Sequence, residues 1–448
     1  MEPVAALLLA HATVLDGVGE AQPDTDILIV AGRVEAIGRA LVAPLGGRVL
    51  DGSGMVVTPG LIDAHVHLMN LPGEPYLALD DPAHDAIVRA QLRAYVACGV
   101  TTVLDAATHP DRMAEIQGWI RAGHPAPRVL SLGPALGPAG GYPSVLDPAF
   151  PGLAHPSDVG PALDLAVSSG AIGAKITVEG GFGSSRYPTF DAEMRAALRT
   201  EAGARGLPLF VHAMSPRDHV ASLDLQPHAW LHGPERPMRR ATEAIALSGA
   251  FVVSTLTVYD ANLVPMNAAI LADPLLQTVV PAREYAAALD RGIVNRARED
   301  VAAFAVPWAP RWAVHDDGIA RWLAGVRLRS AVAAIRELHA AGVPIVLGTD
   351  AGTWPFIQGQ FHGWSAIREL ELLGEAGLSP AEAIAAGTSV SARMLGLEHE
   401  IGTIEVGKAA DLVVLRADPR AGLSAFREIA WSIRAGEART PAEWMASP

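Results

Sequence analysis

The sequence contains a single cysteine, Cys98, and only two lysines, Lys175 and Lys408, among its 34 basic residues. One cysteine excludes an internal disulfide framework, which fits a reducing compartment. The formal net charge of −14 argues against nucleic acid or an anionic membrane as a partner. No uninterrupted apolar run is long enough to span a bilayer. Because arginine supplies nearly all the positive charge, a position that is still lysine has reason to need an amine.

The chain has 448 residues, half of them hydrophobic, which is enough for one large barrel and a smaller unit. Its first residues show no basic region and only a short apolar run, so we expect no signal peptide and a cytoplasmic protein. We expect a small-molecule substrate as its partner, and assembly as a homo-oligomer.

Short strands are predicted at both ends of the chain. Residues 4–55 and the stretch from Gly402 onward show apolar or alternating runs interrupted by Gly and Asp. Both ends are predicted to form one small composite β-sandwich. The predicted division is therefore a sandwich part at 1–55, a barrel at 56–397 and a second sandwich part at 398–448.

The middle of the chain repeats a strand-then-helix rhythm. Glycines follow three predicted helices, at Gly99, Gly206 and Gly342, where a helix stop is expected. Eight such units indicate an α/β fold of the (β/α)₈ TIM-barrel type. A doubly wound open sheet is the alternative, but no G-x-G-x-x-G follows the first strand. The eight predicted strands lie within residues 55–67, 99–108, 127–136, 171–178, 207–215, 228–233, 250–259 and 343–352.

A long insertion, roughly residues 260–330, separates the last two predicted strands. It carries Trp308, Trp312 and Trp322 together with several prolines. Long insertions after barrel strands often cover the active-site face. Two interpretations stay open: a lid or pocket wall, and a helical excursion packed outside the barrel.

Two histidines, His65 and His67, end the first predicted barrel strand in the stretch PGLIDAHVHL. Side chains alternate along a strand, so both imidazoles point to one face and can share a metal ion. A bare H-x-H is more often a pair of hydrogen-bonded strand histidines, so the rest of the chain has to decide.

Further polar residues end other predicted strands. In a barrel these ends converge on one mouth, where four imidazoles, an amine and a carboxylate suit two divalent metal ions. Taken alone, either later histidine is more often a packed residue, and the aspartate is as readily a helix cap. The predicted metal ligands are His65, His67, Lys175, His212, His232 and Asp350.

Lys175 is the most informative of these residues. A lysine is rarely buried in a barrel unless it is paired or modified, and arginine cannot act as a nucleophile. A desolvated, partly neutral amine can add CO₂ and become a carbamate. That change converts a cation into an anionic ligand with two oxygens, at a place where two metal ions need one.

With these motifs, the sequence resembles the amidohydrolase superfamily in its binuclear form with a bridging carboxylated lysine. PGLIDAHVHL and the late stretch IGTIEVGKAADLVVL carry the resemblance, which is greatest to the imidazolonepropionase-like and Xaa-Pro dipeptidase-like branch. It implies that His65, His67 and Asp350 bind a buried metal ion and that His212 and His232 bind a more exposed one. It also implies that Lys175, carboxylated by CO₂, bridges the two. Zn is expected first, although Mn, Fe or Co also suit the ligands.

The expected chemistry is hydrolysis of a C–N bond in an amide, dipeptide, N-acyl amino acid or cyclic amide. Asp350 would act as the base, and Tyr259 or Tyr142 would donate to the oxyanion. Positions that contact substrate in relatives differ here, at Tyr142, Met214 and Ser254, so the substrate stays open. The alternatives are hydrolysis of a lactone, carbamate or phosphotriester by the same site, and a non-catalytic scaffold.

Overall fold

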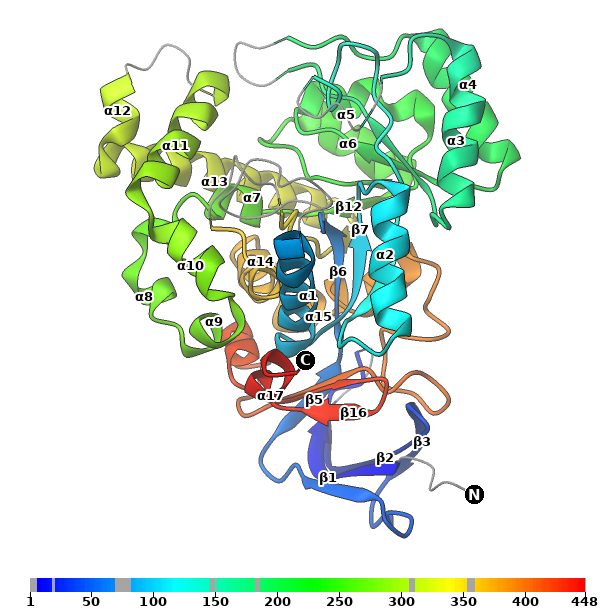
Figure 1. Cartoon of the computed structure of the whole chain (residues 1–448), viewed down its shortest axis with the longest axis vertical. Helices are drawn as coiled ribbons and strands as arrows, with labels where there is room; N and C mark the ends of the chain where they lie inside the picture. The colour runs from blue at the N-terminus through cyan, green and yellow to red at the C-terminus, as the bar shows by residue number, and fades with distance from the viewer. Residues whose placement is uncertain are drawn as a thin grey trace.

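The computed structural model describes residues 6–17, 21–68, 82–145, 150, 152–181, 186–305, 311–352 and 359–447. Strands from the two ends of the chain lie at one end of the molecule, and helices α3–α6 lie at the other (Figure 1). Among the described residues, none of the helices combines the length and the apolar composition that a membrane crossing requires.

One eight-stranded sheet is built from both ends of the chain. Its order is β16-β15-β14-β5-β1-β2-β3, and β4 pairs with β1. Residues Leu9, Ile27, Val57 and Val414 belong to the apolar cluster of this sheet. The predicted union of the two ends is therefore present as a sheet, while its two-layered sandwich form stays a prediction. The strands are β1 (Ala6–Val14), β2 (Gln22–Val30), β3 (Arg33–Gly38), β4 (Arg48–Asp51), β5 (Val56–Pro59), β14 (Leu412–Leu415), β15 (Ile429–Arg434) and β16 (Glu437–Arg439).

The first predicted barrel strand, residues 55–67, is in fact two strands. β5 pairs with β1 and β14 in the terminal sheet, whereas β6 pairs with β7. The change of partners falls at Gly60: its N–H donates to Asp411 O at 2.7 Å, and the next N–H, of Leu61, donates to Gly99 O at 2.9 Å. A Cβ at Gly60 would lie 2.2 Å from Thr101 Oγ1, so the crossing needs glycine. The predicted domain boundaries, at 55/56 and 397/398, stay predictions.

The remaining strands form two parallel sheets of short, buried strands. Isolated parallel bridges, Leu136–Ile176 and Val66–Ala351, connect the edges of the two sheets. Each of the eight predicted ranges contains one of these strands, and the arrangement is consistent with the predicted barrel. One sheet contains β6 (Leu61–Val66), β7 (Val100–Asp105) and β8 (Arg128–Ser131); the other has the order β13-β12-β11-β10-β9, with β9 (Ala174–Thr177), β10 (Leu209–His212), β11 (Ala229–Trp230), β12 (Phe251–Val253) and β13 (Ile345–Val346).

Helices connect these strands, and their ends follow local sequence signals. Gly99, Gly206 and Gly342 have φ values of +74°, +66° and +79° just past a helix, as the predicted stops require. Asp191 caps α4 by accepting from Met194 N. The helices around the parallel strands are α1 (Pro82–Ala97), α2 (Pro110–Arg121), α3 (Val159–Ser168), α4 (Ala192–Ala204), α5 (Pro216–Ala221), α6 (Arg239–Ser248), α14 (Trp364–Glu375), α15 (Pro380–Ala386), α16 (Ser389–Met394) and α17 (Pro441–Met445).

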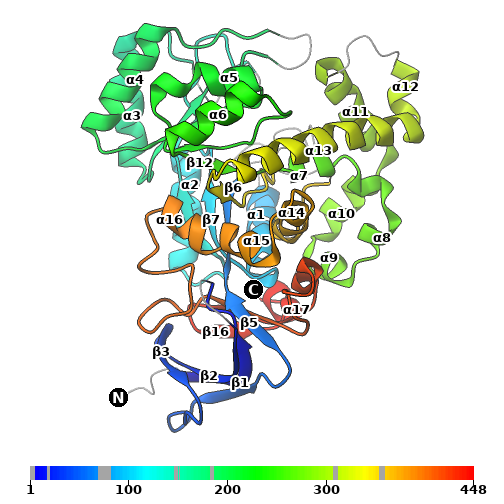
Figure 2. The same ribbon diagram turned by 180° about the vertical axis from the view of Figure 1, so that it is seen from behind.

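The insertion is helical over its described residues, and its two halves lie in different places. The first half packs on the outer flank beside α1 and α14, where Gln91 Nε2 donates to Glu284 Oε1 at 3.1 Å (Figure 1). The long helix α13 runs across the back of the molecule (Figure 2) and places the Arg327 guanidinium 5.3 Å from the Tyr259 ring centre. The helices of the insertion and its flanks are α7 (Thr257–Asp260), α8 (Ala268–Leu271), α9 (Pro274–Val279), α10 (Ala282–Leu289), α11 (Arg291–Ala305), α12 (Arg311–His315) and α13 (Asp317–Ala340).

Candidate metal centre

Three of the predicted ligands lie at the carboxyl ends of parallel strands: His212 ends β10, His232 follows β11 and Asp350 follows β13. Lys175 was predicted to end its strand, but it is the second of the four residues of β9, because the strand continues to Thr177 beside His212. Parallel strands bring these ends to one edge, and all four side chains are buried. Asp350 has φ +59°, a backbone conformation in which aspartate is one of the tolerated residues.

The two histidines of the first strand meet the aspartate of the last. Asp350 Oδ1 lies 3.2 Å from His65 Nε2 and 3.0 Å from His67 Nε2. The backbone N–H of Asp350 donates to His65 O at 2.7 Å, so the two strand ends are joined directly. Burial alone would raise the pKa of Asp350, but its hydrogen bond from His67 and nearby positive charge hold that pKa below the ordinary value.

The other two histidines form the opposite side of the centre. His232 Nε2 lies 3.0 Å from His212 Nδ1, and the two rings cross at 84°. The His65 and His232 ring centres are 4.7 Å apart, which connects the two halves. Burial is the main reason that the pKa values of His65, His212 and His232 fall well below the ordinary histidine value, so these imidazoles are neutral, the form that binds metal.

Hydrogen bonds on the far side of two rings select their tautomers. His65 Nδ1 donates to the Leu231 carbonyl at 2.7 Å, which leaves the Nε2 lone pair facing Asp350. His232 Nδ1 lies 2.9 Å from Thr255 Oγ1, which leaves Nε2 facing His212. Both imidazoles are thus held with a basic nitrogen directed into the centre.

These donor atoms fit a divalent cation. One ligand atom each from His65, His232 and Asp350 lies within 4.8 Å of the others. His65 Nε2 is buried with no hydrogen-bond partner among the described residues, and Asp350 Oδ1 lies 3.2 Å from it. Buried polar atoms without a partner are costly, and a cation among them would compensate for that cost. His67 and His212 border the same group through Asp350 and His232.

Lys175 is buried close to these ligands. The strand pairing places Thr177 beside His212, so Lys175 lies two residues earlier on the adjacent strand. Burial lowers the pKa of Lys175 to about 8, although the carboxylate of Asp350 acts in the opposite direction. Burial is the largest cause of the lowered pKa values of His65 and His212, and the charge of the Lys175 ammonium is the second largest. A pKa near 8 leaves part of the amine neutral at physiological pH.

The two tyrosines have different surroundings. The Tyr142 ring stacks on the His212 ring, with ring centres 4.8 Å apart and planes at 27°. Tyr259 is buried, its hydroxyl has no hydrogen-bond partner in the described part of the chain, and burial raises its pKa. A buried hydroxyl without a partner is available to a ligand.

Sequence reasoning missed a supporting set of polar residues. Glu369 on α14 accepts from Leu256 N at 2.9 Å and Thr257 N at 2.7 Å, which fixes the turn that carries Thr255, the partner of His232. Burial raises the pKa of Glu369 to about 7. A charged residue at a buried position of an apolar helix was the available signal.

Glu179 was also missed, and it touches the centre directly. Its Oε2 lies 3.5 Å from His212 Nε2, and the two side chains are 1% and 4% exposed. Its Oε1 accepts from Gly181 N at 2.9 Å. Burial raises the pKa of Glu179 to about 8. In sequence, Glu179 precedes two glycines and looks like part of a solvated loop, so only its spacing from Lys175 offered a hint.

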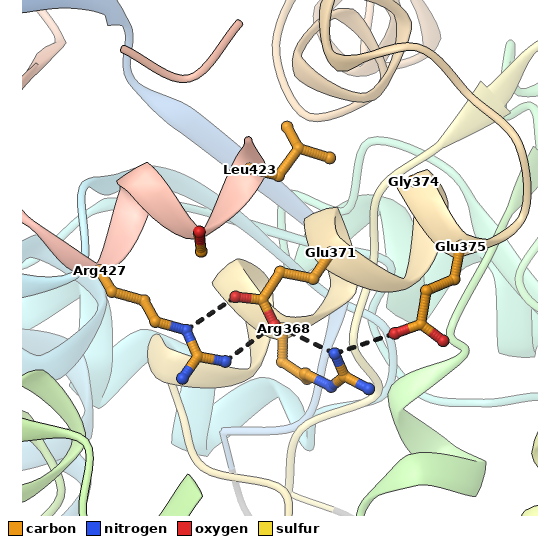
Figure 3. Close-up of a pocket in the computed structure, with 7 residues that line it drawn as sticks. Arg368, Glu371, Gly374, Glu375, Leu423 and Arg427 are labelled. Carbon is orange, nitrogen blue, oxygen red and sulfur yellow. Dashed lines mark hydrogen bonds and ion pairs between the residues drawn. The ribbon is translucent and has the colours of Figure 1, made fainter. Parts of the chain in front are cut away.

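A separate pocket lies on the outer surface between α14 and η4 (Leu423–Arg427). Its charged groups are already paired: Arg427 Nε donates to Glu371 Oε1 at 2.7 Å, and Arg368 Nη1 donates to Glu375 Oε1 at 3.2 Å (Figure 3). Arg368 also contacts Asp260 at the base of the insertion. The side chains that line this pocket therefore form a network of ion pairs, which differs from the metal centre in its chemistry.

Comparisons with known proteins agree with this geometry. The model of the amidohydrolase family matches residues 56–432. The structure is similar to a Xaa-Pro dipeptidase with bound methionine (TM-score 0.75, 21% identity, 97% of this chain and 100% of that chain). It is also similar to a putative prolidase from Bifidobacterium longum (TM-score 0.72, 26% identity, 98% and 95%). A dihydroorotase from Geotalea daltonii is 53% identical over 51 residues, which span 11% of this chain and 12% of that protein.

An α/β fold with a histidine- and aspartate-lined centre at its strand ends is the architecture of a metal-dependent hydrolase. Because the family model covers most of its length, the chain belongs to the amidohydrolase family.

Proposed function

We propose that this chain is a binuclear metal-dependent hydrolase that cleaves a C–N bond, at the mouth of a closed (β/α)₈ barrel. The observation that carries the proposal is the convergence of one ligand atom each from His65, His232 and Asp350 within 4.8 Å. The bridges at Leu136–Ile176 and Val66–Ala351 support closure of the barrel, because each joins an edge of one parallel sheet to an edge of the other. Assembly as a homo-oligomer and a cytoplasmic location stay predictions.

Two divalent ions would share the six ligands. His65, His67 and Asp350 would hold the inner ion, and His212 and His232 would hold the outer one. Lys175, carboxylated by CO₂, would bridge them. The buried position of Lys175 supports this role, because an unmodified ammonium next to two cations would be strongly repelled. Zn suits the ligands best, and Mn, Fe or Co are compatible.

The bound ions would polarise the substrate carbonyl and lower the pKa of water to roughly 7. Asp350 takes the proton of the attacking water and later delivers it to the leaving nitrogen. Its lowered pKa keeps the carboxylate ionised and therefore able to accept a proton, and its backbone N–H is bonded to His65 O on β6.

The tyrosine hydroxyls supply hydrogen bonds to the developing oxyanion. Tyr259 is the first candidate, since its buried hydroxyl has no partner among the described residues. Tyr142 lies over His212 and would contact the substrate from the other side. Replacement of one such donor costs about 10²–10³ in kcat elsewhere, so Tyr259→Phe should lower kcat strongly.

Metal analysis and a substrate panel test the proposal together. We expect about two equivalents of divalent ion per chain and turnover of N-acyl amino acids, dipeptides or cyclic amides. The panel includes lactones, carbamates and phosphotriesters. If only lactones, carbamates or phosphotriesters are hydrolysed, the proposed C–N bond specificity is wrong. A protein that binds no divalent ion would overturn the whole proposal.

A further inference from the structure

The ring of His212 presents different nitrogens to different neighbours. Its Nδ1 faces His232 Nε2 at 3.0 Å, so Nδ1 is the nitrogen directed into the centre. Its Nε2 points the other way and has no hydrogen-bond partner among the described residues. The nearest acceptor given for Nε2 is Glu179 Oε2 at 3.5 Å, and that oxygen also lacks a hydrogen-bond partner.

The backbone holds Glu179 at this position. Val178 N donates to His212 O at 2.9 Å, which extends the β9–β10 pairing to the residue before Glu179. Gly181 N then holds Oε1, so that Oε2 is the oxygen left for the imidazole. The same short stretch therefore carries Lys175 on its strand and Glu179 at its end.

The far-side partners of the other rings make Glu179 distinctive. His65 has a carbonyl and His232 has a hydroxyl at the equivalent place. Only His212 has a carboxyl there, among the three rings whose far-side contacts the structure describes. A carboxyl acceptor fixes the tautomer and raises the basicity of the nitrogen that binds metal. A cation on Nδ1 would in turn strengthen Nε2–H as a donor.

We propose that Glu179 is a positioning residue that holds the Nε2–H of His212, and thereby keeps Nδ1 available to the outer divalent ion. This inference rests on the proposed function, because it presupposes that His212 binds metal. Its imidazole contact is with His212, a proposed ligand of the outer ion, so the effect of Glu179 is expected at the outer ion and not at the one that His65 and His67 would hold.

The experiment measures divalent-ion content and affinity for Zn²⁺ by competition with a chelator, together with the visible spectrum of the Co²⁺-loaded protein. The variants are Glu179→Ala, Glu179→Gln and Glu179→Asp. Matched controls are Glu284→Ala and Glu284→Gln, because Glu284 is equally buried but contacts Gln91, not an imidazole. Thermal unfolding of the metal-free proteins checks that each variant folds.

We expect Glu179→Ala to lower the affinity for one of the two ions by about 10–100-fold and to alter the Co²⁺ spectrum. Glu179→Gln keeps an oxygen that accepts Nε2–H and should restore most of the affinity. Glu179→Asp keeps the carboxyl group but shortens its reach, so it should behave like Glu179→Ala. Both Glu284 variants should bind metal as the wild type does.

Wild-type affinity for both ions in Glu179→Ala would overturn the inference alone. Glu179→Asp with wild-type affinity would also overturn it, since a carboxyl group without the contact would then suffice. A wild-type protein that takes up no divalent ion would overturn the proposed function and this inference together. If Glu179→Ala fails to fold, Glu179→Gln and Glu179→Asp give the same comparison with less disturbance.

Discussion

Thr349 holds both carboxylate oxygens of Asp63. Its backbone N–H donates to Oδ1 at 3.0 Å and its hydroxyl donates to Oδ2 at 2.7 Å. Asp63 lies on β6, two residues before His65, and Thr349 immediately precedes Asp350. A buried polar pair thus joins the two strand ends whose side chains meet in the metal centre.

Thr349→Val should destabilise the protein by about 1–3 kcal/mol, because it leaves a buried carboxylate oxygen without its donor. Urea unfolding measures this loss. Thr278→Val is the matched control: its hydroxyl bonds Pro274 O on an exposed helix, where water can replace it. Equal unfolding midpoints for the two variants would contradict the role given to Thr349.

Lys175→Arg should remove the second metal equivalent, since an arginine stays charged and cannot add CO₂. Turnover should fall with the metal content. The measurement is metal analysis of protein prepared with bicarbonate and excess Zn²⁺, with mass spectrometry of the native wild type for the added CO₂. Two tightly held ions in Lys175→Arg would show that no carbamate bridges them.

Asp350→Asn should lower kcat by at least about 100-fold, the lower range for loss of a general base. The amide keeps the shape but cannot take the proton from water. Metal content has to be measured in the same preparation, because Asp350 is also a proposed ligand. Retained metal together with unaltered turnover would remove Asp350 from the role of base.

Arg368→Met should cost roughly 3–5 kcal/mol, because Asp260 would remain as a buried, unpaired carboxylate. Arg368 forms two hydrogen bonds with it, at 2.9 and 3.0 Å. Arg239→Met is the control, since the Arg239–Glu243 pair is exposed to solvent and contributes little to stability. Chemical denaturation compares the two, and losses of similar size would argue against the network.

Glu284→Gln should change how stability depends on pH. Burial raises the pKa of Glu284 from 4.5 to about 7, so between these values the folded protein binds more protons than the unfolded chain. Its carboxyl faces Gln91 on α1, and Tyr95 is the nearby titratable group. Stability therefore falls as pH rises through this range, by on the order of 3 kcal/mol when complete.

The glutamine variant should flatten that fall and exceed the wild type above pH 7. Unfolding free energies at several pH values from 4 to 8 provide the test. Parallel curves for the wild type and Glu284→Gln would exclude Glu284 as the source of the slope.

Strand-end residues were predictable from sequence, because a polar side chain that directly follows a short apolar run is expected at the end of a buried strand. His212 and Asp350 follow that rule, and the structure places both at one edge. Gly60 was not recognised, since β5 and β6 form one continuous apolar run and only pairing with distant strands separates them. Glu179 and Glu369 depend on tertiary neighbours, His212 and Thr257, so their local signals are weak.

The insertion shows the same limit in another form. Its helices follow local caps such as Asp316, which accepts from Ile319 N. The position of those helices depends on tertiary contacts, such as the hydrogen bond that Trp364 Nε1 donates to Asp273 Oδ2 at 2.9 Å. The periodicity of the sequence does not reveal such contacts. In the structure α10 packs outside the parallel strands, and α13 carries Arg327 to Tyr259. A lid or pocket wall formed by the insertion stays a prediction.

The pairing of β5 with β14 has a consequence for biosynthesis. Pro59 pairs with Leu412, so more than 350 residues must leave the ribosome before this strand finds its neighbour. Until then β5 is an open edge with unsatisfied amides, and contacts so distant in sequence form slowly. Premature termination before residue 412 would therefore release chains whose exposed edge invites aggregation.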